Sequence, residues 1–155
     1  MSTVMTWEVN SGSLDETLAL AARVGQKLKG GEVIELVSDL GGGKTVFVKG
    51  VARGMGIKDL IGSPTFTISS QYKAGDLVLH HFDFYRLGEP GIISNELEEI
   101  IGMPENVVAI EWADLVNAVL PQNRLSIHIH TLGESERKLK FHYTEDLQYL
   151  IPAKT

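Results

Sequence analysis

The sequence contains no cysteine among its 155 residues. This absence excludes disulfide bonds, a catalytic thiolate and any metal site built on cysteine sulfur. The sequence also lacks an apolar run near the roughly 20 residues that cross a bilayer, and residues 1–10 lack the basic start and apolar core of a signal peptide. We therefore expect a cytoplasmic protein with no membrane association.

Basic residues are fewer than acidic ones. The chain has 14 Lys and Arg residues and 20 Asp and Glu residues, so its formal net charge is −6. Proteins that bind nucleic acid gain most of their affinity from basic side chains that neutralise phosphates. The composition leaves no surplus for this, so we expect any RNA to be held by a partner protein. Hydrophobic and charged residues make up 43% and 22% of the chain, which is ordinary for a globular protein of one domain.

The most informative stretch runs from residue 33 to residue 50. An apolar run over residues 34–37 ends at Ser38 and Asp39, three glycines follow, and Lys44 and Thr45 open a segment whose apolar residues recur at helical spacing. Strand, glycine turn, Lys-Thr and helix are the order of a phosphate-binding loop. The alternative is a glycine-rich turn beside an exposed Lys-Thr pair.

The glycines at positions 41–43 allow backbone N–H groups to contact phosphate oxygens, because no Cβ atom intervenes. The start of the following helix adds free N–H donors and the positive end of its dipole. We expect Lys44 to contact the outer phosphates and the Thr45 hydroxyl to bind Mg²⁺. Ser38 stands where the full pattern has another glycine, so we expect it to make the turn slightly less favourable.

Residues 107–112 form the second informative stretch. Four consecutive apolar residues of strand type indicate a central parallel strand covered on both faces, and Glu111 follows them directly. Open α/β sheets bind their ligands at the carboxyl ends of their strands. We therefore interpret Glu111 as the residue that completes the Mg²⁺ shell opposite Thr45, rather than as an ordinary strand end. Trp112 either supports this site by packing or belongs to the core.

Residues 62–67 predict a stiff loop of small and hydroxyl-bearing residues. This loop either presents Thr65 to the terminal phosphate, so that its order depends on the bound nucleotide, or is an ordinary connection.

A β-hairpin is predicted from residues 67–72 and 77–84, which flank a Gly-Asp turn. Asp83 ends the second arm and is either exposed at the strand tip or directed at the site. His80 and His81 precede it, and no acidic or histidine partner stands near them at metal-ligand spacing. We therefore interpret these two histidines as a pair that is either packed in the core or placed at its rim, rather than as metal ligands.

The rest of the chain predicts further helices and strands. They are a strand over residues 3–9, a helix over 14–28 with a capping box at Ser13 and Glu16, a short helix within 86–103, a short helix over 113–120, and a hairpin from 125–130 and 138–143. The acidic residues at 96–99 fit either a solvated face or a docking surface. Arg137, beside the last hairpin, is a further candidate for contacting a nucleotide.

Four motifs, SDLGGGKTVFVKGVARGMGI, SPTF, HFDFYRL and IEW, occur in this order and at spacings that resemble those of the TsaE family, formerly YjeE. The resemblance covers nearly the whole chain. It implies an α/β fold of the P-loop NTPase type, with a mostly parallel sheet flanked by helices and antiparallel hairpin additions, in a single ATPase domain over residues 1–155.

The resemblance also implies a function. Members of this family are small ATPases of the bacterial pathway that installs threonylcarbamoyl-adenosine next to the tRNA anticodon. ATP and Mg²⁺ are the implied cofactors, and the implied hydrolysis is slow. The implied partners are the TsaB and TsaD proteins, which handle the tRNA.

The resemblance assigns roles to individual residues. The phosphate loop corresponds to Gly41, Gly42, Gly43, Lys44, Thr45 and Val46. Metal binding falls to Thr45 and Glu111, and Thr65 and Asp83 are switch or hydrolysis-supporting residues. Hydrolysis requires neutralisation of the charge that develops on the transferred phosphoryl group, which Lys44, the loop N–H groups and Mg²⁺ can supply. Asp83 is the first candidate for aligning the attacking water.

Two other functions share such a loop. A small-molecule kinase would need an acceptor pocket and usually a lid that carries arginines over the phosphates, but the arginines of this chain are scattered. A nucleotide-gated binding module would hold ATP as a conformational switch and barely hydrolyse it.

Overall fold

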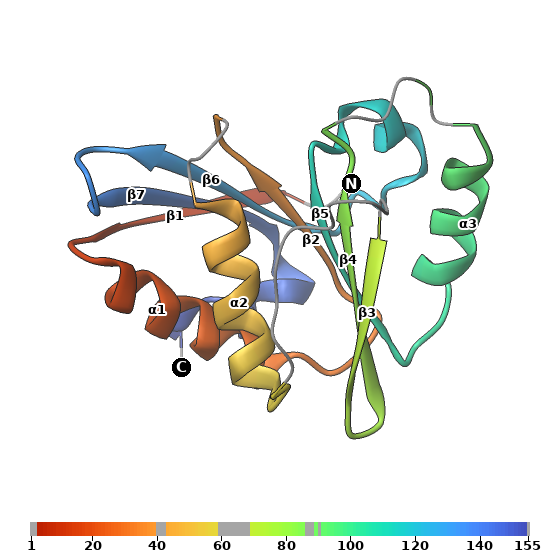
Figure 1. Ribbon diagram of the computed structural model, residues 1–155, viewed down its shortest axis with the longest axis horizontal. Helices are drawn as coiled ribbons and strands as arrows, with labels where there is room; N and C mark the ends of the chain where they lie inside the picture. Colours follow the sequence, from red (N-terminus) through yellow and green to blue (C-terminus); the bar gives the residue numbers. More distant parts are fainter. Residues whose placement is uncertain (1–2, 40–42, 59–68, 86–88, 90, 155) are drawn as a thin grey trace.

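A single sheet organises the protein in the computed structural model, which describes residues 3–39, 43–58, 69–85, 89 and 91–154 (Figure 1). Across this sheet, the strands of the described residues follow the order β1-β7-β6-β2-β5-β4-β3. Their bounds are β1 (Val4–Ser11), β2 (Val33–Val37), β3 (Ser69–Ala74), β4 (Leu77–Asp83), β5 (Asn106–Glu111), β6 (Leu125–Thr131) and β7 (Arg137–Thr144).

The centre of the sheet is parallel and both ends are antiparallel. β5 pairs in parallel with β2 and with β4, and β2 also pairs in parallel with β6. β7 and β1 extend one side as antiparallel strands, and β3 forms the predicted hairpin with β4 on the other. All six residues of β5 are buried, as expected for a strand covered on both faces. The predicted α/β fold with antiparallel additions is confirmed.

The described part of the chain contains three α-helices and three 3-10 segments. They are α1 (Leu14–Lys27), α2 (Lys44–Met55), α3 (Gly91–Ile101), η1 (Ala113–Val119), η2 (Glu145–Leu150) and η3 (Pro152–Lys154). Two of the 3-10 segments, η2 and η3, follow the last strand. The short helix predicted before Pro121 takes the 3-10 form, which is common for brief connectors. The sequence predicted no element after residue 145, where η2 and η3 lie. None of the described helices has the length and apolar character needed to cross a membrane.

The helix α1 begins at the predicted capping box. The Glu16 backbone N–H donates to Ser13 Oγ at 3.1 Å, and the Glu16 carboxylate accepts from the Gly12 N–H at 2.6 Å. The first bond satisfies a donor that an open helix start would leave without a partner. The second differs from a standard capping box, because the carboxylate binds the N–H of the residue before the cap and not that of Ser13.

The two sheet faces carry separate hydrophobic cores. The helices α1 and α2 cover the larger core, to which the sheet contributes side chains such as Leu36, Leu79 and Ala109. The helix α3 and η1 cover the smaller core, which contains Phe82 and Ile110. Because side chains alternate along a strand, each residue of the central strands can be assigned to one of these faces.

The helices α1 and α2 approach each other closely enough that three contact positions require glycine. A Cβ atom added to Gly25 would lie 2.1 Å from the carbonyl oxygen of Val51, and one added to Gly54 would lie 2.1 Å from that of Ala22. Gly50 is also confined, though less tightly, with the nearest atom 2.5 Å from an added Cβ. The backbone of one helix therefore packs directly on the other, which fixes the position of α2 over the sheet.

We predict that Gly50→Ala destabilises the fold. Its added Cβ would lie 2.5 Å from Ala21 Cβ and 2.7 Å from the Leu18 carbonyl oxygen. Overpacking of this kind costs about 1–3 kcal/mol, even though alanine is the better helix former. Chemical denaturation should show a lower free energy of unfolding than for Gly102→Ala, whose Cβ would have its nearest neighbour at 3.5 Å. Equal stability of the two variants would contradict the close packing of α1 on α2.

Candidate functional site

Three parallel strands end side by side at one edge of the sheet. In the pairing register, Leu36 of β2 lies opposite Glu111 of β5, and Asp83 of β4 lies opposite the same Glu111. Asp83 and Glu111 are the last residues of their strands. The chain also leaves β2 at this edge and re-enters the described structure just before α2, so the two carboxylates lie at the carboxyl ends of the strands.

The carboxylates also lie on the face that α2 covers. Leu79 of β4 and Ala109 of β5 belong to the core beneath α1 and α2. Side chains two residues further along a strand return to the same face. This places His81, Asp83 and Glu111 on that face, next to the start of α2.

The cap residue before α2 is Gly43, which has a φ of +106° and makes no side-chain cap. A glycine is favoured here because this is the left-handed region of the backbone. The Phe47 N–H donates to the Gly43 carbonyl at 3.0 Å and starts the helix, and the first turn contains no acidic residue. The positive end of the dipole is therefore not offset by an acidic side chain of that turn. Gly41 and Gly42 lie outside the described residues.

Lys44 is the first residue of α2 and is only 5% exposed. Its Nζ donates to the Ser38 carbonyl at 3.2 Å, to Ser38 Oγ at 3.0 Å and to the Asp39 carbonyl at 3.2 Å. The same atom lies 4.5 Å from the centroid of the Trp112 ring, within the range of a cation–π contact. Ser38 therefore has a role that the sequence analysis missed, because it supplies two of the acceptors that hold the lysine.

Burial lowers the pKa of Lys44 below its usual value, because the ammonium loses contact with water. The carboxylates of Glu111, Asp83 and Asp39 oppose this shift and favour the charged form. The two carboxylates at the strand ends thus act on the same ammonium group, which shows that β4, β5 and α2 direct their charged side chains toward a common place.

Glu111 is 3% exposed and has a partner that sequence spacing did not indicate. Its Oε2 lies 2.5 Å from Nε2 of His81, which is fully buried on the neighbouring strand β4. The other histidine, His80, directs its Nε2 to Oδ1 of Asn106 at 2.9 Å. Both histidines are buried, as the packed interpretation predicts. The acidic partner of His81 comes from a strand 30 residues away, which the local spacing of the sequence does not reveal.

Trp112 adopts a left-handed backbone conformation, with φ 60° and ψ 54°. Such a conformation is costly for a bulky residue and is found mostly at functional sites. The indole ring contacts both Lys44 and the Tyr85 ring, whose centroid lies 5.0 Å away. The Tyr85 N–H in turn donates to Asp83 Oδ1 at 3.1 Å. Trp112 therefore lies at the site, while it also packs against the smaller core.

Arg137 lies beside the start of α2. A Cβ atom added to Gly43 would lie 3.7 Å from Nε of Arg137. The Nη1 atom of Arg137 donates to the carbonyls of Gly133, Glu134 and Glu136. The guanidinium therefore holds the β6–β7 turn next to Gly43. Thr45 and Val46 occupy the first turn of α2, both partly exposed, and Thr65 lies outside the described residues.

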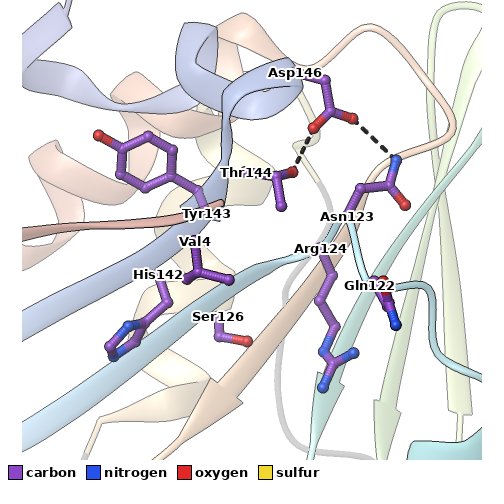
Figure 2. A pocket seen from close by; sticks show the side chains of 9 residues that line it. All are labelled: Val4, Gln122, Asn123, Arg124, Ser126, His142, Tyr143, Thr144 and Asp146. Atoms are coloured by element: carbon purple, nitrogen blue, oxygen red, sulfur yellow. Dashed lines mark hydrogen bonds between the residues drawn. The ribbon is translucent and has the colours of Figure 1, made fainter. Parts of the chain in front are cut away.

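A cavity of about 540 Å³ lies elsewhere on the protein (Figure 2). It is lined by residues that precede or begin β6, such as Arg124, and by the end of β7, and is therefore at the opposite edge of the parallel strands. Several of its polar groups already have partners: Asp146 accepts from Thr144 and Asn123 within the lining, and Arg124 donates to Glu35 outside it. A much smaller cavity, of about 70 Å³, is lined by Ser38, Lys44 and Trp112 among others.

Family membership follows from comparison with known proteins. The family model described as "Threonylcarbamoyl adenosine biosynthesis protein TsaE" matches residues 11–139. The chain belongs to the TsaE family. The resemblance inferred from the four motifs is thereby confirmed, and with it the coarse role of the family in tRNA threonylcarbamoyladenosine biosynthesis.

Individual TsaE proteins match most of the chain. The tRNA threonylcarbamoyladenosine biosynthesis protein TsaE of Bacillus subtilis is 41% identical over 132 residues, which cover 82% of this chain and 79% of that protein. The TsaE protein of Aquifex aeolicus is 34% identical to this chain, and the match covers 87% of this chain and 95% of that protein. A crystal structure of Bacillus subtilis YdiB superposes with a TM-score of 0.80 at 34% identity, covering 99% of this chain and 96% of that one.

We predict that Glu111→Gln lowers the pKa of Lys44 further. The carboxylate opposes the downward shift caused by burial, so its loss leaves the ammonium less stabilised. An NMR titration of the lysine side-chain signals should show Lys44 losing its proton at lower pH in Glu111→Gln than in the wild type. Glu105→Gln is the control, because Glu105 is exposed at the other end of β5, and an equal effect of both variants would contradict the proximity of Glu111 to Lys44.

Proposed function

We propose that this protein binds ATP with Mg²⁺ at the start of α2 and hydrolyses it slowly as an accessory protein of tRNA threonylcarbamoyladenosine modification. The observation that carries the proposal is the placement of Lys44, at a helix start free of acidic side chains and beside two carboxylates that end neighbouring parallel strands. This combination suits a phosphate group together with its cation. Family membership supports the assignment to tRNA modification.

Each charged residue has a role in this proposal. Lys44 binds the outer phosphates, and the N–H groups at the start of α2 bind phosphate oxygens. Thr45 and Glu111 hold the cation, whose charge neutralises the phosphate oxygens during transfer. Among the described residues, no three histidine or acidic side chains gather as a metal site. A Mg²⁺ bound mainly by phosphates and water needs only one or two protein ligands.

Asp83 is the candidate for orienting the attacking water. It lies at the same strand edge as Glu111, is partly exposed, and accepts a hydrogen bond from the Tyr85 N–H through one oxygen. Thr65 is the candidate for sensing the terminal phosphate. Trp112 and Arg137 complete the nucleotide site in this proposal, the first beneath Lys44 and the second beside Gly43.

We propose that the partners are the TsaB and TsaD proteins rather than tRNA itself. The formal net charge of −6 disfavours direct binding of a polyanion, because the chain has too few basic residues to neutralise phosphates. Contact with tRNA would therefore be indirect, through the partner complex.

We expect phosphate release from ATP when the protein is mixed with TsaB and TsaD. Lys44→Ala should reduce the release at least roughly tenfold, since a hydrogen bond to a charged group contributes about 1.5–3 kcal/mol. Lys49→Ala is the matched control, because Lys49 is an exposed lysine of the same helix. Release that requires an added small acceptor would indicate a kinase, and tight ATP binding without release under any condition would indicate a nucleotide-gated binding module.

We predict that Glu111→Gln removes most of the gain in ATP affinity that Mg²⁺ produces. The amide cannot bind the cation as a carboxylate does, whereas ATP binding without metal should persist because Lys44 remains. Isothermal titration calorimetry with Mg²⁺ and with EDTA measures this gain for the variant, for the wild type and for the control Glu105→Gln. A wild-type response to magnesium in Glu111→Gln would remove Glu111 from the metal site.

A further inference from the structure

His81 and Glu111 form a contact that family membership and the phosphate loop do not explain. Both side chains are withdrawn from water, with His81 fully buried and Glu111 3% exposed. They belong to the neighbouring strands β4 and β5 and lie on the same sheet face, and their Nε2 and Oε2 atoms are 2.5 Å apart. A buried carboxylate needs such a partner, because its charge is poorly solvated.

The His81 ring has one hydrogen-bond partner among the described residues. Its Nε2 lies at hydrogen-bond distance from the Glu111 carboxylate, whereas its other nitrogen, Nδ1, is buried and finds no partner there. Loss of the contact with Glu111 would therefore leave the ring without its polar partner in the described part of the chain, and would leave the buried carboxylate poorly solvated.

This bond restricts the direction of the Glu111 carboxylate. A glutamate has three rotatable side-chain bonds, and a hydrogen bond to one oxygen removes much of that freedom. In metal sites, partners of this kind orient the ligand, and their loss typically weakens metal binding about 10–100-fold. The bond to His81 uses Oε2 and leaves Oε1 for another ligand.

We propose that His81 is a positioning residue, which holds the Glu111 carboxylate so that its free oxygen faces the cation of the bound nucleotide. The inference rests on the proposed role of Glu111 in binding Mg²⁺ and adds the residue that orients it. His81 touches neither the phosphates nor the cation in this arrangement and acts through Glu111 alone.

His80 provides a matched control in the same strand. It is 6% exposed and also makes a side-chain hydrogen bond, to Asn106. Its ring stacks on Phe82 of the smaller core, so it lies on the opposite sheet face from His81. Replacement of either histidine removes a buried ring and a hydrogen bond, but only His81 contacts Glu111.

The test compares the ATP affinity with Mg²⁺ and with EDTA, measured by calorimetry on the full chain. His81→Leu should reduce the Mg²⁺-dependent gain about 10–100-fold, whereas His80→Leu should keep the wild-type gain even where both lower the melting temperature. His81→Gln should restore most of the gain, because its amide N–H₂ can reach the position of Nε2. His81→Asn is equally polar but shorter, and should not restore the Mg²⁺-dependent gain. If His81→Leu does not fold, the comparison of His81→Gln with His81→Asn tests the proposal in its place.

A double variant checks that the effect passes through Glu111. His81→Leu combined with Glu111→Gln should lose no more of the Mg²⁺-dependent gain than Glu111→Gln alone, because interacting residues give non-additive effects. Additive losses, or a wild-type gain in His81→Leu, would overturn the positioning role and leave the proposed function intact. A wild-type protein without any gain from Mg²⁺ would overturn both.

Discussion

The register of the parallel strands β2, β5 and β4 determines where the chemistry of this protein can occur. Because Asp83 and Leu36 both lie opposite Glu111, the chain leaves β2 at the point where two neighbouring strands present carboxylates. A shift of one residue in β5 would turn Glu111 to the face covered by α3, since side chains alternate. The four consecutive apolar residues before Glu111 do not fix this register alone, because both faces of β5 are buried and either face accepts an apolar side chain. The pairing with the neighbouring strands is needed as well.

The packing of α1 on α2 extends this constraint from the sheet to the helix. At Gly25 and Gly54 the two backbones leave no room for a Cβ atom, so α2 has little freedom to slide or rotate. Its first residue, Lys44, is therefore presented at a fixed height above the strand ends. A lysine side chain is flexible, but this one is held between carbonyl groups and an indole ring. The fold thus positions the helix, and local contacts position the ammonium.

Most elements could be predicted from the sequence because their patterns are local. The capping box at Ser13, the alternation along β6 and β7, and the apolar run before Glu111 each depend on neighbouring residues. The contact between His81 and Glu111 depends on the pairing of β4 with β5, which no local pattern specifies. The alternation along β4 does place His81 on the same side as Asp83, and with the strand order known this would have pointed to Glu111. The role of Ser38 was missed for a similar reason, since its partner Lys44 is six residues away and no local pattern indicates this bond.

The contacts of Lys44 bear on how a phosphate ligand would enter the site. An ammonium that is nearly buried is stabilised by Ser38, Asp39 and the Trp112 ring before any ligand arrives. Within the proposed function, phosphate oxygens must replace some of these contacts, so the affinity reflects a difference between two well-bonded states rather than the whole strength of a charge pair. The left-handed backbone of Trp112 holds its ring beneath the lysine. The strain at Trp112 therefore also affects the affinity for a phosphate ligand. A relaxed backbone would remove the contact of the ring with Lys44, which the phosphate oxygens otherwise have to compete with.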